Sequence, residues 1–323
     1  MSPRIWYRYL IAATALAGAA GCTGAGLQPA QPPGSQGAPV QRPVGRSWMS
    51  PDARHHDLLY VSDLGNDVVD VYSFPEGKLK GTLTGFTALH SGCVDVKGNV
   101  FITSSERIYE FAHGGTKPIR TLIDAGYGPT GCSVDPKTGT LAVANIGPIS
   151  GSSSGNIAFY KRAKGTPQMY ADPSMFFYYD CAYDGSSNLY VTGGDFHGFF
   201  TFAEVLAGGT SFTGVTLNQQ INVPGGVQWD GKFVAVEDQG AGYHGSTVYD
   251  FKISGAYGTR IRTVSLKGSS DAIQFWIEGN KIIGPNIGSS PNVMWWKYPL
   301  AGNALKTITG FTEPVGVTVS RAP

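Results

Sequence analysis

The segment LLYVSDLGNDVVDVYSFPEGKL (residues 58–79) contains a short strand-like phrase that occurs six times along the chain. Each copy is a mostly apolar run that ends on a small or polar residue. Successive copies begin 41, 41, 48, 44 and 49 residues apart. Periods of about 40–50 residues with several strands in each unit are typical of β-propellers. The copies are LYVSD (59–63), VFITS (100–104), LAVAN (141–145), LYVTG (189–193), FVAVE (233–237) and IIGPN (282–286).

The two ends of the repeat predict how the ring closes. Each copy is followed by three more strand-like segments, but the first copy has no such strand before it. The last segment, Pro314–Ser320, has no copy after it. We therefore expect the C-terminal strand to complete the first blade, which leaves no unpaired sheet edge in the ring. The prediction is an all-β, six-bladed β-propeller over residues 55–323; the alternative is seven blades, with residues 47–53 in a degenerate blade.

Two phrases resemble a known class of propeller. The segment quoted above and GPTGCSVDPKTGTLAVAN (residues 128–145) are similar to NHL-repeat and YVTN-type propeller repeats. The resemblance covers roughly residues 55–320. It implies the fold without an activity, because such propellers include enzymes, ligand binders and scaffolds.

The first 22 residues resemble a bacterial lipoprotein signal peptide. Arg4 and Arg8 precede an apolar stretch, residues 10–20, that is too short to span a bilayer. The sequence LAGAAGC then ends at Cys22, the expected site of lipid attachment, which makes the membrane a partner. The alternative is ordinary cleavage after residues 17–19 and secretion. Both alternatives place the mature protein outside the cytoplasm, as an anchored lipoprotein of the cell envelope or a secreted protein.

Residues 23–54 are expected to form a disordered tether. They are rich in Pro, Gly, Gln and Ala and cannot bury a core. The net charge of the chain is +1 and no run of Lys or Arg occurs, so the sequence predicts no nucleic-acid partner.

Polar residues end the first strand in most copies and suggest a metal site. Asp63, Asn145, Glu237 and Asn286 come from four different blades, which only a closed ring brings near one another. Their carboxylate and amide oxygens suit Ca²⁺ or Mg²⁺. The arrangement resembles the six-bladed lactonase family, which has a carboxylate and amide metal site at the channel mouth, and in that case Asp63 or Glu237 would act as general base. The competing interpretation is that these residues only start turns.

Aromatic loops in the middle blades suggest a ligand site at the same mouth. Aromatic faces with His and Asp between them suit sugars or aromatic ligands, although some of these rings are expected to pack beneath the loops. The candidate ligand-binding residues are Tyr178, Tyr179, Phe196, His197, Tyr243 and His244.

Three cysteines fall in one slot of consecutive blades. Cys93, Cys132 and Cys181 align with Val or Ile in the other copies, so we expect buried apolar positions too far apart for a disulfide. The combined prediction is a ligand-binding or protein-interaction module for a small molecule or an envelope protein. The alternatives are a metal-dependent lactonase-like or lyase-like enzyme and a purely structural envelope protein.

Overall fold

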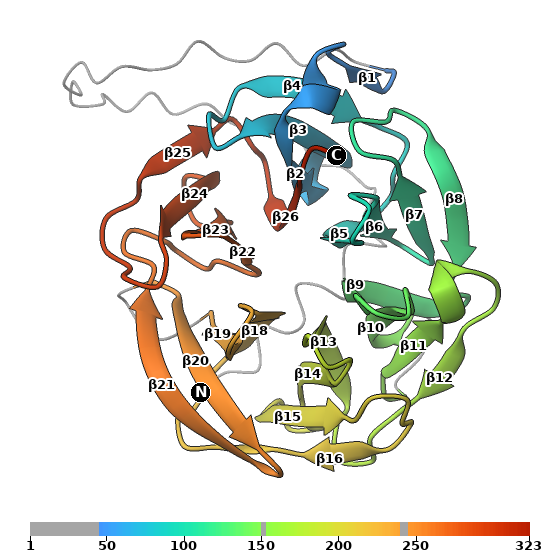
Figure 1. Cartoon of the computed structure of the whole chain (residues 1–323), viewed down its shortest axis with the longest axis vertical. Helices are drawn as coiled ribbons and strands as arrows, with labels where there is room; N and C mark the ends of the chain where they lie inside the picture. Colours follow the sequence, from blue (N-terminus) through green and yellow to red (C-terminus); the bar gives the residue numbers. More distant parts are fainter. Residues whose placement is uncertain (1–44, 150–152, 240–244) are drawn as a thin grey trace, which may run out of the picture. The chain divides into compact units, whose positions relative to one another are not determined.

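Six antiparallel sheets stand as blades around a central axis (Figure 1). The computed structural model describes residues 45–149, 153–239 and 245–323. Blades are numbered here in the order of their second strands. From blade 1 to blade 6, the strands nearest the axis are β26 (Pro314–Ser320), β5 (Leu89–Val94), β9 (Tyr127–Val134), β13 (Phe177–Tyr183), β18 (Pro224–Trp229) and β22 (Trp276–Glu278). The second strands are β2 (Asp57–Asp63), β6 (Val100–Ser104), β10 (Leu141–Pro148), β14 (Leu189–Gly194), β19 (Val234–Asp238) and β23 (Lys281–Asn286).

The outer half of each blade follows directly in the chain. The third strands are β3 (Val68–Phe74), β7 (Arg107–Phe111), β11 (Asn156–Tyr160), β15 (Phe200–Val205), β20 (Thr247–Ser254) and β24 (Asn292–Lys297). The outer strands are β4 (Leu79–Leu83), β8 (Pro118–Ile123), β12 (Gln168–Tyr170), β16 (Phe212–Gly214), β21 (Tyr257–Ser265) and β25 (Lys306–Thr309). Two short strands add fifth members: β1 (Trp48–Met49) pairs with β4, and β17 (Thr216–Leu217) pairs in parallel with β21.

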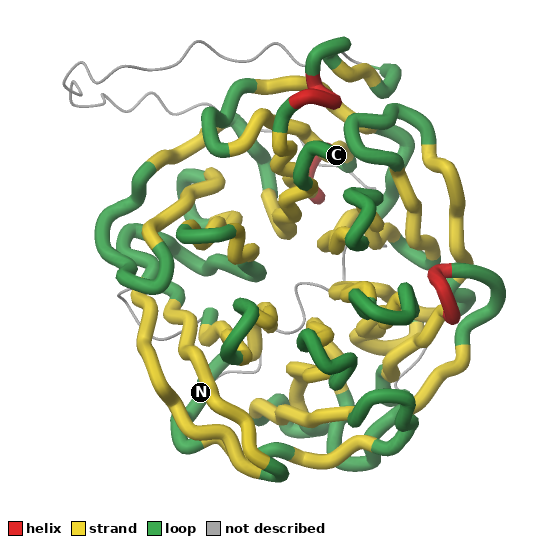
Figure 2. The backbone as a smooth tube through the Cα atoms, in the orientation of Figure 1, coloured by secondary structure: helices red, strands yellow, loops and turns green. Residues whose placement is uncertain are grey.

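Helices contribute little to the described part of the chain. It contains three single-turn 3₁₀ helices between strands, η2 (Ala53–His55), η3 (Leu64–Asn66) and η4 (Lys161–Ala163). Figure 2 shows helix only as short pieces among strands and loops. No helix in the described ranges is long and apolar enough to cross a membrane. The architecture confirms the all-β prediction.

The C-terminal strand closes the ring as the sequence predicts. β26 is antiparallel to β2, with Leu59 opposite Val319 and Val61 opposite Val317. Residues at opposite ends of the chain therefore share one sheet, and six blades are complete. The seven-bladed alternative is wrong, because Trp48–Met49 extends blade 1 through β4 instead of starting another blade.

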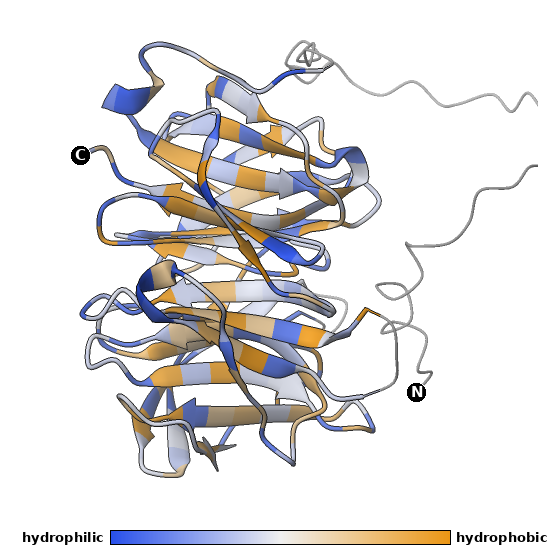
Figure 3. Ribbon diagram, turned by 90° about the vertical axis from the view of Figure 1, so that its right-hand side faces the viewer, coloured by the Kyte–Doolittle hydropathy of each residue, from blue (hydrophilic) through white to orange (hydrophobic). Residues whose placement is uncertain are grey.

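The core consists of six apolar layers, one between each pair of neighbouring blades. Side chains along a strand point alternately to its two faces, so one strand serves two layers. On β24, Trp295 packs with blade 1 and its neighbour Trp296 packs with blade 5. The layer between blades 6 and 1 includes Val317 and Val319 of β26, so the closing strand seals both a sheet and a core layer. Apolar and polar residues alternate along the strands in the side view (Figure 3).

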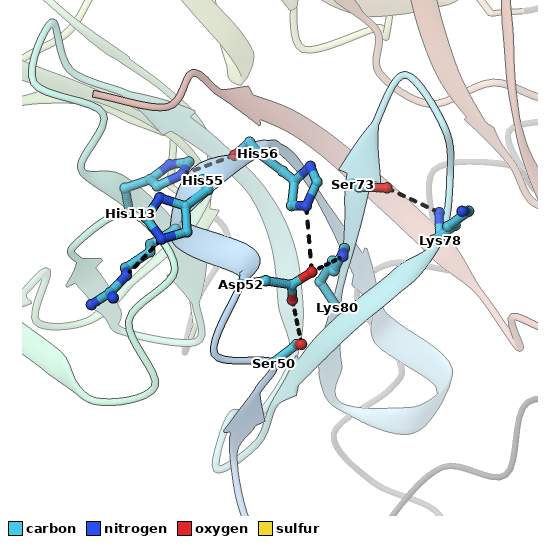
Figure 4. A network of polar contacts seen from close by, with 9 residues as sticks. Ser50, Asp52, His55, His56, Ser73, Lys78, Lys80 and His113 are labelled. Atoms are coloured by element: carbon cyan, nitrogen blue, oxygen red, sulfur yellow. Dashed lines mark hydrogen bonds and ion pairs between the residues drawn. The ribbon is translucent and has the colours of Figure 1, made fainter.

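Polar contacts attach the segment before β2 to blades 1 and 2 (Figure 4). The carboxylate of Asp52 accepts hydrogen bonds from Lys80 Nζ, at 2.6 Å, and from Ser50 Oγ, and lies 3.4 Å from the ring of His56. The ring of His113, in the loop after β7, lies 3.1 Å from the carbonyl oxygen of His56. These contacts and β1 hold residues 48–56 against the ring, although a tether was expected as far as residue 54.

Candidate functional site

A β-bulge interrupts the inner strand at the same level in five blades. The register between inner and second strands shifts near the end of the second strand. In blade 6, an isolated bridge between Ala272 and Asn286 precedes the short β22. Bulges leave residues outside the ladder and redirect their side chains. The channel wall therefore carries one irregular belt of residues that include Ser91, Thr130, Tyr179, Gly225 and Val315.

The polar residues that end the second strands cap the loops before the inner strands. Asp63 is fully buried, and its carboxylate accepts the N–H groups of Thr312 and Glu313 at 2.7–3.2 Å. It also accepts the amide of Asn66 at 2.8 Å. A buried carboxylate with several hydrogen bonds of this kind fixes loop backbone.

In blade 5 the equivalent residue is Asp238, one position beyond Glu237. Asp238 lies opposite Pro224 just as Asp63 lies opposite Pro314. Its carboxylate accepts the N–H groups of the two residues before that proline, Asn222 at 3.0 Å and Val223 at 3.1 Å. The sequence alignment that ended the fifth copy at Glu237 was therefore wrong by one residue.

The two asparagines of the predicted metal set make hydrogen bonds within their own blades. Asn286 accepts Ser270 N–H at 3.3 Å and donates to Asn292 at 2.9 Å, and Asn145 donates to Asn156 at 2.9 Å. Both asparagines are buried. Across the described ranges, no three His, Cys, Asp or Glu side chains lie close enough together to hold a metal ion.

One side of the channel wall is joined covalently. Cys93 on β5 and Cys132 on β9 form a disulfide with their Cα atoms 5.6 Å apart, so the prediction that this spacing excludes a bond was wrong. The two residues are one register step apart, since Cys93 lies opposite Phe101 whereas Cys132 lies opposite Val143, the equivalent of Ile102. Cys93 therefore faces blade 3 and Cys132 faces blade 2, within one core layer. Cys181 is buried and free.

The other side of the wall brings together two carboxylates and an amide from blades 4, 5 and 6. Consecutive backbone N–H groups of the blade 5 bulge donate to different acids: Gly226 to Glu237 Oε2 at 3.2 Å, and Val227 to Asp180 Oδ2 at 3.1 Å. Gln274 Nε2 donates to the same oxygen of Asp180 at 3.3 Å. Within the described residues, neither acid takes part in a salt bridge.

Burial dominates the electrostatics of this acidic wall. It raises the pKa of Asp180 from its ordinary value of 3.8 to about 7, against the hydrogen bonds from Val227, Cys181 and Gln274. Burial also raises the pKa of Glu237 well above its usual range, and repulsion from Asp180 adds to the effect. The Oε1 atoms of Glu237 and Gln274 are both buried without a hydrogen-bond partner among the described residues.

Sequence reasoning missed Asp180 and Gln274, but a signal for Asp180 was present. Asp180 lies on the inner strand opposite Thr192, which is one residue before the end position of the repeat in blade 4. The corresponding inner-strand residues of blades 1, 3 and 5 are Gly316, Gly131 and Gly226. The position is crowded, because a Cβ on Gly131 would lie 2.7 Å from the Cα of Asp180. Blade 4 therefore carries an ionisable residue at a position where these three blades have glycine.

The aromatic candidates divide into buried and exposed groups. Tyr178 is fully buried, and its hydroxyl bonds to the backbone of Asp172. Tyr179 is half-buried and donates to the carbonyl oxygen of Ile273 at 3.0 Å, which links blade 4 to blade 6. Tyr243 and His244 lie outside the described residues, as does Cys22.

An aromatic patch on blade 4 consists of the exposed residues Phe196, His197 and Phe199 and the half-buried residues Phe176 and Phe177. The side chains of Phe196 and Phe199 are 72% and 70% exposed. Neighbouring rings contact one another, with centroids 4.8–6.3 Å apart.

A tight turn fixes this patch in place. Asp195 Oδ1 accepts the N–H groups of His197 at 2.8 Å and Phe199 at 2.9 Å. Gly198 adopts φ of +81°, which glycine tolerates without strain. Comparable turns at Asp95 and Asp184 have Val96 and Gly185 at the position of Phe196, and Asn99 and Asn188 at the position of Phe199. The exposed rings are therefore not required by the turn.

Comparisons with known proteins support the fold alone. No family model and no curated protein matches the chain. A solved chain in a nidogen/laminin complex is similar in structure, with a TM-score of 0.65 and 14% identity over 82% of this chain and 99% of that chain. A protein of unknown function from Bacteroides caccae has a TM-score of 0.61 and 12% identity over the same shares, 82% and 99%. Both likenesses indicate a β-propeller.

Proposed function

We propose that this chain is an extracytoplasmic, lipid-anchored β-propeller that binds a partner protein of the cell envelope through the aromatic patch of blade 4. The observation that carries the proposal is the exposure of Phe196 and Phe199 on a turn in which two backbone N–H groups donate to the carboxylate of Asp195. Exposed aromatic rings reduce solubility and are typical of binding surfaces, where they supply large contact areas.

The fixed conformation of the turn also favours binding. Rings that are already held in place lose little conformational entropy when a partner covers them. His197, which is exposed between the two phenylalanines, adds a polar group to the same surface. A polar group beside apolar rings gives directional specificity as well as contact area.

Two features support the location outside the cytoplasm. The first 22 residues have the order of a lipoprotein signal peptide that ends at Cys22. The disulfide between Cys93 and Cys132 belongs to a class of bond that persists in oxidising compartments and is rare in the cytosol. The similarly folded chain of the nidogen/laminin complex occurs together with another protein, which agrees with an interaction module.

Crosslinking in intact cells tests the interaction. We expect a double substitution, Phe196→Ser with Phe199→Ser, to abolish the crosslinked product of the parent protein while leaving its thermal unfolding unchanged. The matched control is Leu300→Ser with Leu305→Ser, which removes two exposed apolar side chains, 71% and 56% exposed, between β24 and β25. Loss of the product in both variants, or in neither, contradicts the proposed surface and favours a purely structural role.

Membrane fractionation tests the anchor separately. We expect Cys22→Ala to release the protein from the membrane fraction or to block its processing. Mass spectrometry of the mature N-terminus gives an independent readout, and an unmodified terminus would support secretion instead.

A further inference from the structure

The channel contains a pocket in its half nearest the carboxyl ends of the inner strands. The cavity has a volume of about 130 Å³ and is lined from five blades. On β13 the lining runs from Asp180 to Tyr183, and on β18 it runs from Val227 to Trp229. Tyr183 and Trp229 are the last residues of these two strands. The bond from Tyr179 to Ile273 crosses between blades beside the Asp180 end of the pocket.

The lining is rich in acceptors and has no cationic side chain. Among the described residues that line the pocket, none is Lys, Arg or His. Asp180 and Gln274 belong to the lining, and Glu237 lies close enough to Asp180 for charge repulsion. A carboxylate without a counter-ion in a buried site favours a cationic ligand.

A second observation points to a ligand in the same place. Gln274 is 7% exposed, and its Oε1 has no hydrogen-bond partner although its Nε2 is bound to Asp180. Buried acceptors are almost always paired in folded proteins, so an unpaired amide oxygen beside a cavity indicates a place for a donor. A donor at this place could reach both the amide oxygen and the carboxylate.

The remaining lining distinguishes between kinds of cation. No group of three His, Cys, Asp or Glu side chains in the described residues can hold a metal ion. The lining instead includes the aromatic residues Tyr183, Trp229, Phe275 and Trp276. Aromatic faces attract organic ammonium groups through their π electrons and pack against alkyl chains.

We propose that this pocket binds a small protonated alkylamine, with the ammonium group hydrogen-bonded to Asp180 and Gln274 and the alkyl part against the tryptophan rings. The volume sets the size, since about 30 Å³ per water leaves room for about four or five non-hydrogen atoms. This site is separate from the aromatic patch of blade 4, so either can fail without the other.

Calorimetric titration of the full-length protein tests the site, with tryptophan fluorescence as a second readout. The probes are n-butylammonium and its neutral counterpart 1-butanol. We expect saturable binding of butylammonium and none of 1-butanol. Asp180→Asn should weaken binding at least about tenfold, the loss of one charge-assisted hydrogen bond. The control, Glu76→Gln, removes an exposed carboxylate from the turn after β3 and should bind like the parent.

Several results would overturn the proposal. These are equal binding of butanol, equal affinities in Asp180→Asn and Glu76→Gln, or a response to Na⁺, K⁺ or Ca²⁺ that butylammonium does not compete with. Because Asp180 is buried, its variant could fail to fold, and Trp276→Leu then provides the second test with both carboxylates intact. We expect it to weaken butylammonium binding several-fold, and an unchanged affinity would refute the aromatic part of the site.

Discussion

The channel wall of blades 2 and 3 and the channel wall of blades 4 to 6 share one strand geometry but differ in how their buried polar groups are paired. In the first, Thr103 Oγ1 lies 3.0 Å from the carbonyl oxygen of Ser91 and 3.1 Å from that of Thr130, either of which accepts its one proton, and Ser91 Oγ donates to Thr130 O at 2.7 Å. The nearby disulfide joins the same two inner strands. In the second wall, two buried acids share the donors of one bulge.

The difference can be traced to one register position. Thr103, Thr192 and Glu237 all lie next to the capping position of their second strands. Thr192 Oγ1 donates to Gly225 O at 2.9 Å, as Thr103 donates in blade 2. An ionised Glu237 has no proton to donate, whereas a protonated one can act like threonine. At this position blades 2 and 4 therefore have a neutral hydroxyl donor, whereas donation in blade 5 depends on the protonation state of Glu237.

Breaking the disulfide in the wall of blades 2 and 3 should have the largest effect. The two cysteines are 39 residues apart in sequence, and closing a loop of that length stabilises a fold by about 4 kcal/mol in the chain-entropy treatment. We expect Cys93→Ala with Cys132→Ala to lower the free energy of unfolding by about this amount. Reductant should lower the Tm of the parent and of the control Cys181→Ala, and leave the double variant unchanged. A double variant that still responds to reductant would contradict the pairing.

Crowding the joint between the two walls should have the next largest effect. A Cβ on Gly131 would lie 2.7 Å from the Cα of Asp180, so backbone must shift in Gly131→Ala. We expect a loss of about 1–3 kcal/mol in urea unfolding, the usual cost of overpacking. Gly128→Ala on the same strand is the control, because its nearest atom would be 3.6 Å away. Equal effects of the two substitutions would show that the walls are not in tight contact.

Removing the acid of blade 4 should flatten the pH dependence of stability. The folded-state pKa of Asp180, about 7, exceeds its ordinary value of 3.8, so the folded protein keeps a proton that the unfolded chain releases. This contribution is complete below pH 3.8 and is lost as pH rises through about 7. Between these values the free energy of unfolding should fall by up to about 1.4 kcal/mol per pH unit for this group. We measure the free energy of unfolding by urea titration at several pH values. Its decrease with pH should be shallower in Asp180→Asn than in the parent, and an identical pH dependence would contradict the assignment.

The smallest effect should come from replacing the acid of blade 5, Glu237, with its amide. Glu237→Gln supplies a permanent donor, so we expect stability within about 0.5 kcal/mol of the parent at pH 5 and higher than the parent at pH 9. Thr192→Val is the counterpart, since it removes a satisfied donor and should cost about 1 kcal/mol at both pH values. The comparison between the walls fails if Glu237→Gln is the more damaging of the two at pH 9.

The sequence was sufficient for the propeller because the signal is periodic. Six copies of an apolar run and an unmatched C-terminal strand allow few other arrangements, and the closure by β26 followed directly. The site was less accessible, since its geometry depends on register. A shift of one residue moved the capping role from Glu237 to Asp238 and turned Cys93 toward Cys132. Bulges cause such shifts, and their position cannot be read from an apolar pattern that repeats every two residues.

What the sequence by itself determined was the repeat and the closing strand, and it favoured six blades over seven. Those features depend on hydrophobic periodicity and composition, which are local along the chain. Only the tertiary structure decided that Asp180, Glu237 and Gln274 meet, because they belong to three blades and are separated by dozens of residues. The same holds for the disulfide and the pocket, since both arise where inner strands approach one axis. A ring fold places residues that are distant in sequence next to one another, and strand register determines the direction in which each of their side chains points.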